Sequence, residues 1–237
     1  MTIDKDIFEK ALSPVGVPLP DGAFERFDRY AELLISYNEK VNLTAITDPD
    51  GIVYKHFADS LYLLKYASLP LGAKLCDVGS GAGFPGVCLK LARPDLSLTL
   101  FESVGKKAAF LTYLCRELGI EAEVVNMRAE TAGASPAYRE RFDVATARAV
   151  AALNKLCEYC LPLVKIRGTF VPLKAPLGEE ERQRGYGAAR LLGAKPQKTI
   201  PYALPGGDAR EILIFEKNSP TPPRYPRNSG TIMKKPL

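Results

Sequence analysis

The feature that most restricts the fold of this chain is the stretch LCDVGSGAGFPGVCLK at residues 75–90. An apolar run reaches an acidic residue at Asp77, and closely spaced glycines follow before a helical pattern begins: Gly79, Gly81, Gly83 and Gly86. Glycines at alternate positions after a strand let the backbone turn tightly and come close to a ligand. The stretch therefore predicts a strand, a ligand-binding turn and a helix, in that order.

Downstream of this turn, short apolar runs alternate with helical patterns. The predicted strands cover residues 73–78, 97–102, 121–126, 142–147, 167–173, 197–203 and 210–216, and the predicted helices cover 84–93, 104–118, 150–161 and 179–192. Such alternation indicates an α/β fold with a doubly wound, mostly parallel sheet, here of seven strands. A short Pro-Gly-Gly turn without a helix joins the last two strands, which requires an antiparallel C-terminal hairpin.

The residues before the glycine stretch have a helical pattern instead. Residues 4–68 are read as helical, and within 24–38 the apolar side chains recur at spacings of three and four residues, which predicts one buried stripe. A Leu-Pro-Leu-Gly turn ends this part of the chain. We therefore divide the protein into an N-terminal helical segment, a domain that carries the glycine turn, and a basic, Pro-rich tail: residues 1–70, 71–217 and 218–237.

Composition and patterning exclude several classes of protein. The chain has 237 residues, 46% of them hydrophobic, which is enough to bury a sizeable core. It has no run of about 18 apolar residues to cross a membrane, and its charged start, MTIDKDIFEK, does not resemble a secretory signal. Five cysteines outside any dense framework indicate reduced thiols. We expect a cytoplasmic monomer that does not associate with membranes.

The positive charge is concentrated in the tail. The net charge is +5, and residues 218–237 contain four cations and no acid: Arg224, Arg227, Lys234 and Lys235. A basic end on a nearly neutral body indicates a polyanionic partner, although a solvated tail that aids solubility fits the charge equally well. Prolines would keep the tail extended along an RNA backbone, where Tyr225 could stack on a base, and Lys174 could join these contacts. We expect the tail to be dispensable for cofactor binding.

The acid before the glycines distinguishes two cofactors. Read from Gly81, the text matches the dinucleotide pattern G-x-G-x-x-G, which places a pyrophosphate at a helix N-terminus. The Asp77 carboxylate would repel that group, but it would favour the ammonium and sulfonium of S-adenosylmethionine. Glu102, at the end of the second strand, can accept hydrogen bonds from the ribose of either cofactor. We therefore predict S-adenosylmethionine, and a tight turn without a ligand remains the alternative.

Several motifs resemble one protein family. The string DVGSGAGFPG, together with NLTAITDPD at 42–50 and HFADS at 56–60, resembles the glucose-inhibited-division protein B family. The resemblance continues through ESVGKKAAFL, RAE, ARA and the RYPR…G…KKPL ending, so it covers nearly the whole chain from about residue 20. It departs at LKAP, where the family usually has LKG, and at Asn228, where a lysine is common. Members of this family methylate guanine N7 in bacterial small-subunit ribosomal RNA.

The resemblance implies a Rossmann-like class I methyltransferase fold, with residues 71–217 as the methyltransferase domain that binds S-adenosylmethionine. It further implies that five residues surround the cofactor. Gly79 and Phe84 would line its methionine and adenosine part, Ala129 and Glu130 would meet the adenine, and Arg148 would face the pocket from the fourth strand. Together with Asp77 and Glu102, these residues follow successive strands, where ligands bind in open α/β sheets. A surface ion pair is the alternative role for Arg148.

Methylation of guanine N7 makes few chemical demands, because N7 already presents a lone pair. Alignment and exclusion of water can drive such a transfer, so we expect no obligatory general base and assign no catalytic residue. The chain lacks the Pro-Cys, Thr-Cys and [DNS]-P-P-[YF] motifs of other methylation mechanisms. Cys157 and Cys160 form the one close cysteine pair, and without a second pair we expect them to pack in a helix and predict no metal site.

The sequence allows alternatives for the role of His56 and for the substrate. His56 is the only histidine, and it could lie near the guanine or the methionine carboxylate, or it could pair with Asp59 to tie the helical segment to the sheet, which we favour. The predicted substrate is 16S ribosomal RNA, either free or within the small ribosomal subunit. The alternatives are a small-molecule methyltransferase and a non-catalytic RNA-binding or dinucleotide-sensing protein of the same fold.

Overall fold

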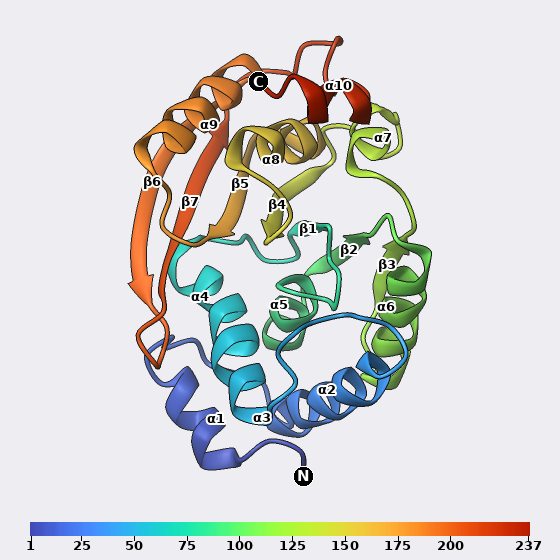
Figure 1. The fold of residues 1–237 in the computed structure, drawn as a ribbon, viewed down its shortest axis with the longest axis vertical. Coiled ribbons are helices and arrows are strands. Elements are labelled where there is room, and N and C mark those ends of the chain that lie inside the picture. The colour runs from blue at the N-terminus through green and yellow to red at the C-terminus, as the bar shows by residue number, and fades with distance from the viewer.

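The computed structural model of residues 1–237 contains one seven-stranded sheet with helices on both faces (Figure 1). The strands lie in the order β3-β2-β1-β4-β5-β7-β6. Their bounds are β1 Lys74–Val78, β2 Ser97–Phe101, β3 Ala122–Val125, β4 Phe142–Arg148, β5 Val164–Lys174, β6 Ala194–Ala203 and β7 Ala209–Lys217. The first five strands are parallel, and β7 is antiparallel to both β5 and β6. The predicted parallel sheet with its C-terminal hairpin is therefore confirmed.

The strand order creates a crevice in the middle of the sheet. From β1 the chain moves outward to β2 and β3, and it then returns to place β4 on the other side of β1. Ligands of open α/β sheets bind at such a reversal, outside the carboxyl ends of the strands. A ligand-binding site is therefore expected at the chain segments that follow β1 and β4.

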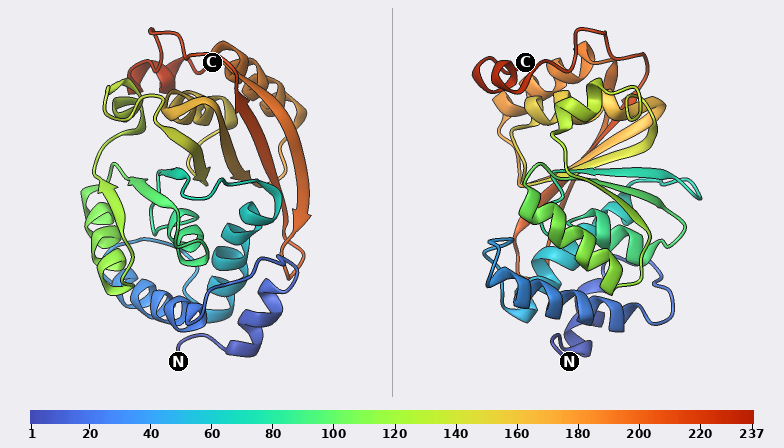
Figure 2. Two further views of the ribbon diagram at one scale, coloured as in Figure 1. Left: turned by 180° about the vertical axis from the view of Figure 1, so that it is seen from behind. Right: turned by 90° about the vertical axis from the view of Figure 1, so that its right-hand side faces the viewer.

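Two groups of helices cover the two faces of the sheet (Figures 1 and 2). One face carries α1 Lys5–Leu12, α2 Ala23–Asn38, α3 Pro49–Gly51, the π-helical η1 Ile52–Ala58, α4 Asp59–Tyr66, α5 Gly86–Ala92 and α6 Gly105–Glu117. The other face carries α7 Ala129–Ala134, α8 Leu153–Cys160, the 3-10 turn η2 Leu161–Leu163, α9 Glu179–Leu191 and α10 Ser229–Lys234. Helices α7 and α10 have no counterpart among the sequence predictions.

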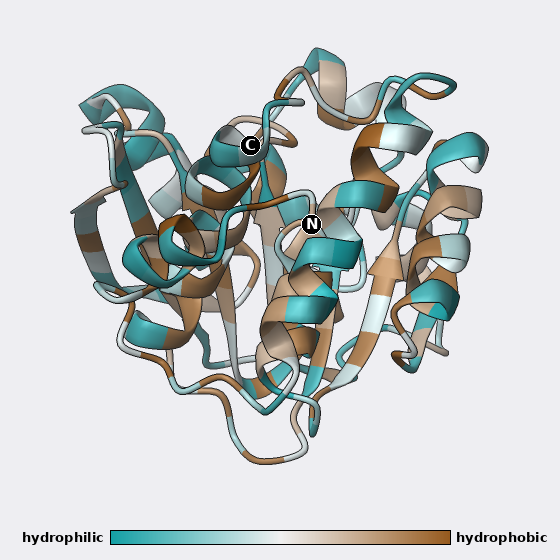
Figure 3. Cartoon of the chain, turned by 90° about the horizontal axis from the view of Figure 1, so that it is seen from below, coloured by the Kyte–Doolittle hydropathy of each residue, from teal (hydrophilic) through white to brown (hydrophobic).

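The N-terminal helices share a hydrophobic core with the sheet. A cluster of 42 buried residues joins Phe27 and Leu34 of α2 to Leu75 and Leu98 of the strands. A second cluster of 22 residues lies on the opposite face, under α7 to α9. Figure 3 shows the hydrophobic strands in the interior and hydrophilic residues on the outer turns of the helices. The segment 1–70 therefore packs directly on the sheet.

The buried stripe predicted for α2 explains this packing. Phe27, Tyr30 and Ala31 recur at helical spacing and are fully buried. The predicted helical stretch 49–67 is the continuous run α3–η1–α4, which begins where the Asp48 side chain accepts a hydrogen bond from the Gly51 N–H. Its middle part is wound as a π-helix, a form that frequently occurs at functional sites.

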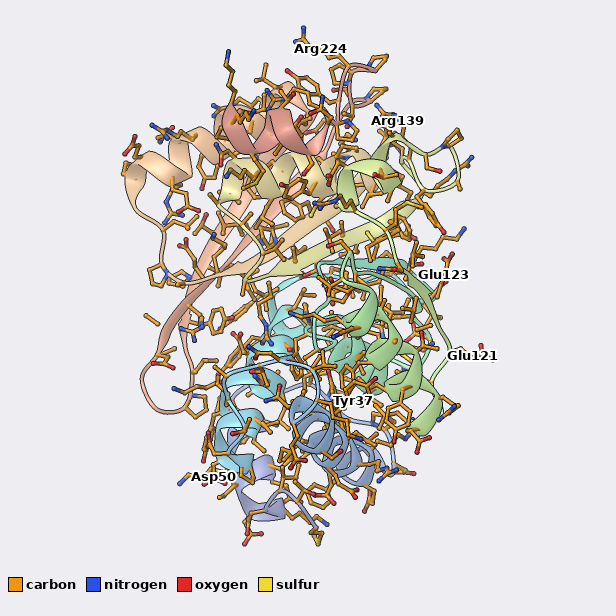
Figure 4. All side chains as sticks on the ribbon, turned by 45° about the vertical axis from the view of Figure 1, so that its right-hand side comes forward. Tyr37, Asp50, Glu121, Glu123, Arg139 and Arg224 are labelled. Carbon is orange, nitrogen blue, oxygen red and sulfur yellow. The ribbon has the colours of Figure 1, made fainter.

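The tail at 218–237 is not an extended strand of solvated residues, as its prolines suggested. Arg139, which precedes β4, donates hydrogen bonds to the carbonyl oxygens of Thr221 at 2.7 Å and Tyr225 at 2.8 Å. Tyr225 is buried in the second core cluster, so the prediction that it stacks on RNA is wrong. Figure 4 places Arg139 and Arg224 together at the end of the molecule opposite Asp50.

Arg227 is bound by a buried carboxylate of α8. Its Nη2 lies 2.6 Å from Oε2 of Glu158, a residue of α8 that is completely buried, and its Nε and backbone N–H bind the other carboxylate oxygen. A buried carboxylate needs such a partner, because an unpaired charge away from water is costly. Arg227 therefore has a structural role, and its contact with RNA stays a prediction, as do the contacts of the exposed Arg224, Lys234 and Lys235.

The cysteine side chains all lie in the interior of the protein. All five thiols are free and buried, and Cys157 and Cys160 pack in the second core cluster. No group of three or more His, Cys, Asp or Glu residues is placed to hold a metal ion. None of the helices combines the length and the apolar character needed to traverse a bilayer.

Candidate active site

The chain passes from β1 to α5 through the glycine turn, which we define as residues 79–85. Gly79 adopts φ +71°, in the left-handed region that favours glycine. A Cβ atom at Gly79 would lie 2.7 Å from Cγ2 of Val150, in the loop after β4. Backbone conformation and close approach therefore both require glycine here, and the predicted tight strand-to-helix turn is confirmed.

The two carboxylates predicted around the turn hold its backbone. Asp77 is fully buried, and its Oδ2 accepts a hydrogen bond from the Gly86 N–H at 2.9 Å. Glu102 accepts hydrogen bonds from the Gly81 N–H at 2.9 Å and the Val104 N–H at 2.8 Å, one on each oxygen. Burial raises the pKa of Asp77 to about 7, although the hydrogen bond from Gly86 opposes this effect.

A cavity of about 320 Å³ lies beside the turn, and we call it the glycine-turn cavity. It brings together Gly79, Ala129 and Glu130, three of the predicted cofactor-binding residues. Its walls come from segments that follow β1 to β4, from α8 and from α10: Val78, Gly79, Phe101, Ser103, Met127, Arg128, Ala129, Glu130, Val150, Ala151, Ala152, Lys155, Tyr159 and Met233. Sequence reasoning missed Lys155, Tyr159 and Met233, because no local pattern connects them with the glycines.

Two buried side-chain oxygens near this site lack any hydrogen-bond partner. They are Oδ1 of Asp77 and Oε1 of Glu130. Buried polar atoms are almost always paired in folded proteins, so each of these two oxygens is free to take a further hydrogen-bond partner. Asp77 lies behind the glycine turn, and Glu130 lies in the wall of the glycine-turn cavity.

A second cavity, of about 530 Å³, lies on the other side of the loop Ala149–Ala152, and we call it the arginine cavity. Arg148, Lys174 and Arg210 are among the residues that line it, together with His56 and Asp59. The structure thus places Arg148 in a different cavity from Gly79 and Glu130. The separating loop follows β4 directly, and Ala149 takes a positive φ of +56° to make the turn.

Arg148 is fixed by contacts to the N-terminal helices. Its Nη1 lies 2.9 Å from Oδ2 of Asp59, and the two side chains are 11% and 4% exposed. The guanidinium also lies 4.8 Å from the centroid of the Phe84 ring. Arg148 is therefore not part of a surface ion pair, which was the alternative considered from the sequence. Asp59 also accepts a hydrogen bond from Tyr202 at 2.7 Å.

His56 lies beside this ion pair but does not bind Asp59, so the His56–Asp59 pair that we favoured is wrong. Its Nδ1 lies 3.2 Å from Nη2 of Arg148, and its Nε2 lies 2.9 Å from Oγ1 of Thr44. Because a guanidinium can only donate, Nδ1 accepts and Nε2 carries the proton. Burial and then the charge of Arg148 lower the pKa of His56 to about 3, so the ring is neutral at neutral pH.

Phe84 does not line the glycine-turn cavity. It is 5% exposed, and its ring stacks on His56 at 4.4 Å and on Tyr30 at 5.2 Å between centroids. Aromatic contacts with the N-terminal helices hold the Phe84 ring beneath the turn. Phe84 thus supports the turn from the side of Arg148, and its predicted contact with a cofactor stays a prediction.

Lys174 holds the loop between the two cavities. Its Nζ donates a hydrogen bond to the carbonyl oxygen of Ala151 at 3.0 Å and lies 3.1 Å from Oε1 of Glu181. Glu181 in turn accepts a hydrogen bond from the Leu153 N–H at 2.9 Å. Lys174, which the sequence suggested for RNA contacts, therefore stabilises the loop between the two cavities.

The sheet topology, the glycine turn and the cavity beside it define a class I methyltransferase fold. A putative methyltransferase from Bacillus halodurans superposes with a TM-score of 0.54 at 13% identity, covering 68% of this chain and all of the other. An S-adenosylmethionine-dependent methyltransferase from Aquifex aeolicus gives 0.54 at 16% identity, covering 76% and 97% of the two chains. At these identities the likeness concerns the fold alone.

The chain belongs to the GidB family, described as rRNA small subunit methyltransferase G, whose family model matches residues 23–204. Curated relatives named ribosomal RNA small subunit methyltransferase G extend the match over nearly the whole chain. The Exiguobacterium sibiricum protein is 43% identical, covering 97% of this chain and 98% of its own. The Lactobacillus delbrueckii subsp. bulgaricus protein is 44% identical, covering 99% and 100%. The resemblance read from the motifs is confirmed.

Proposed function

We propose that this protein transfers the methyl group of S-adenosylmethionine to N7 of a guanine in 16S ribosomal RNA, in the cytoplasm. Family membership supports the reaction class, and one structural observation supports the cofactor. The glycine-turn cavity lies at the reversal of strand order and has an unpaired buried acceptor, Oε1 of Glu130, in its wall.

The hydrogen-bonding groups and charges of these residues match those of S-adenosylmethionine. Adenine offers amino hydrogens, for which Oε1 of Glu130 is a free acceptor. The ribose offers hydroxyl hydrogens, and the Glu102 carboxylate keeps lone pairs beyond the two hydrogen bonds that it accepts from the backbone. The α-ammonium and the sulfonium are cationic, and Asp77 supplies a carboxyl group behind the turn. Gly79 lets the backbone approach the ligand without a side chain.

S-adenosylmethionine supplies an electrophilic methyl group, and N7 of guanine supplies a lone pair, so no proton has to be removed. The protein's own contribution is then to align the two groups and to exclude water. His56 fits this view, because a histidine with a pKa of about 3 is a weak base at neutral pH. We assign no residue as a general base.

We place the target guanine in the arginine cavity, which adjoins the glycine-turn cavity across the loop Ala149–Ala152. Cations in its wall, Lys55, Arg148 and Arg210 among them, suit the O6 acceptor of guanine and the phosphates of its backbone. The exposed Arg224, Lys234 and Lys235 would extend the contact along the RNA.

A methyl-transfer assay tests this proposal. The protein is incubated with S-adenosylmethionine labelled in its methyl group and with 16S RNA, intact 30S particles or a pool of small metabolites. We expect label in RNA or in particles. Treatment with borohydride and aniline should then cleave the RNA chain at the labelled guanine, as it does at 7-methylguanine. Label in the metabolites alone would identify a small-molecule methyltransferase, and label in no acceptor despite cofactor binding would contradict the reaction.

A further inference from the structure

The outer wall of the glycine-turn cavity comes from the C-terminal end of the chain. Helix α10 lies beside α7 and α8, at the same end of the molecule as the cavity's α8 residues (Figure 1). Met233 of α10 lines the cavity, and its sulfur lies 3.9 Å from the hydroxyl of Tyr159 and 3.8 Å from Nζ of Lys155. Both partners also line the cavity. The tail and the cofactor site are therefore one structural unit.

Several contacts hold α10 in this position. Ile232 is completely buried, and Asn228 caps the helix by accepting a hydrogen bond from the Thr231 N–H at 2.9 Å. Arg227 precedes the cap and is bound to the buried Glu158 of α8. Asn228, which departs from the lysine common in the family, thus has a clear structural role here. The helix is therefore anchored through residues that precede Met233, the residue that lines the cavity.

The wall that Met233 completes suits an aromatic, amino-bearing ring. Met127, Ala129 and Met233 give apolar contact, and Oε1 of Glu130 is the unpaired acceptor among them. A thioether is polarizable and packs well on aromatic rings. Met233 is 58% exposed, which leaves much of its surface to be covered by a ligand.

We propose that α10 is the outer wall of the adenine subsite, with Met233 packed against the adenine ring of S-adenosylmethionine. This inference rests on the proposed cofactor. It reverses the expectation that the tail is dispensable for cofactor binding.

Calorimetric titration with S-adenosylhomocysteine and with 5′-methylthioadenosine, which lacks the amino-acid part, tests the inference. The variant is Met233→Ala, and the matched control is Leu191→Ala, a 49% exposed apolar residue at the end of α9 that lines neither cavity. We expect Met233→Ala to raise the Kd of both ligands roughly tenfold. The control should leave both constants unchanged.

The outcomes separate this inference from the proposed function. If the unaltered protein binds neither ligand, the proposed cofactor itself is wrong. If the unaltered protein binds both ligands and Met233→Ala binds them equally well, only the role of α10 is overturned. An effect on S-adenosylhomocysteine without one on methylthioadenosine would also overturn it, because Met233 would then act at the amino-acid end. Circular dichroism confirms that each variant is folded.

Discussion

Arg148 and Asp59 form a buried ion pair, 2.9 Å between Nη1 and Oδ2, which joins the end of β4 to the start of α4. The two residues lie 89 positions apart in the chain. The pair fixes the N-terminal helices against the carboxyl edge of the sheet, where the arginine cavity opens. The helical segment at 1–70 thus contributes directly to the site.

Breaking this pair should destabilise the fold. In Asp59→Ala the guanidinium of Arg148 loses its carboxylate in a buried position, so the free energy of unfolding should fall by about 3 kcal/mol or more. Urea unfolding measures the change. The control is Glu180→Gln, which removes the exposed Arg184–Glu180 pair and should change stability by no more than about 0.5 kcal/mol. Equal effects of the two substitutions would show that Arg148 is better solvated than its burial indicates.

Asp77 should make stability fall as the pH rises. Burial raises the pKa of its carboxyl from 3.8 to about 7 in the folded protein. Between these values the folded state keeps a proton that the unfolded chain has released, so the free energy of unfolding decreases with pH, by roughly 4 kcal/mol in total. In Asp77→Asn this contribution should vanish. Parallel pH profiles of the two proteins in urea unfolding would contradict a buried, raised carboxyl.

Glu102→Gln should weaken cofactor binding. The amide keeps a single acceptor oxygen, so either Gly81 or Val104 loses its hydrogen bond, and the proposed bonds to the ribose lose their charge. Charge-assisted hydrogen bonds contribute roughly 1.5–3 kcal/mol, so the Kd of S-adenosylhomocysteine should rise about tenfold or more. The exposed Glu123→Gln on β3, labelled in Figure 4, is the control. Unchanged affinity in a folded Glu102→Gln protein would remove Glu102 from the site.

The tail cations should divide into two kinds. Replacing Arg224, Lys234 or Lys235 by Ala should weaken RNA binding and lower its salt slope by about 0.7–0.9 for each lost phosphate contact. Replacing Arg227 should instead lower the melting temperature, because Glu158 stays buried without its partner. Filter binding across a salt series and thermal unfolding measure the two effects. An unchanged salt slope in the triple variant would show that the tail does not contact RNA.

Local patterns were sufficient to predict the framework of the protein. The alternation of strands and helices, the glycine turn at 79–85 and the antiparallel hairpin depend on residues close together in sequence, whose spacing carries the signal. Gly79 and Glu130 line one cavity, because the carboxyl ends of neighbouring parallel strands meet at one edge of a sheet, and their contact with a cofactor stays a prediction. The family resemblance extended these predictions to individual residues.

The roles of several side chains depended on partners far away in the chain. Arg227 and Lys174 look alike as solvated cations in a sequence, yet one neutralises the buried Glu158 and the other holds the loop at Ala151. The proline content of the tail predicted an extended, solvated segment, but in the structure the tail folds back so that Tyr225 is buried in the second core cluster. The periodicity of a sequence indicates which face of a helix or strand is apolar. Which charges are buried, and which partners they find, depends on how the helices and strands pack together. The sequence therefore determined the sheet, the turn and the family, and the tertiary structure alone decided that the C-terminal helix lines the cavity beside the turn.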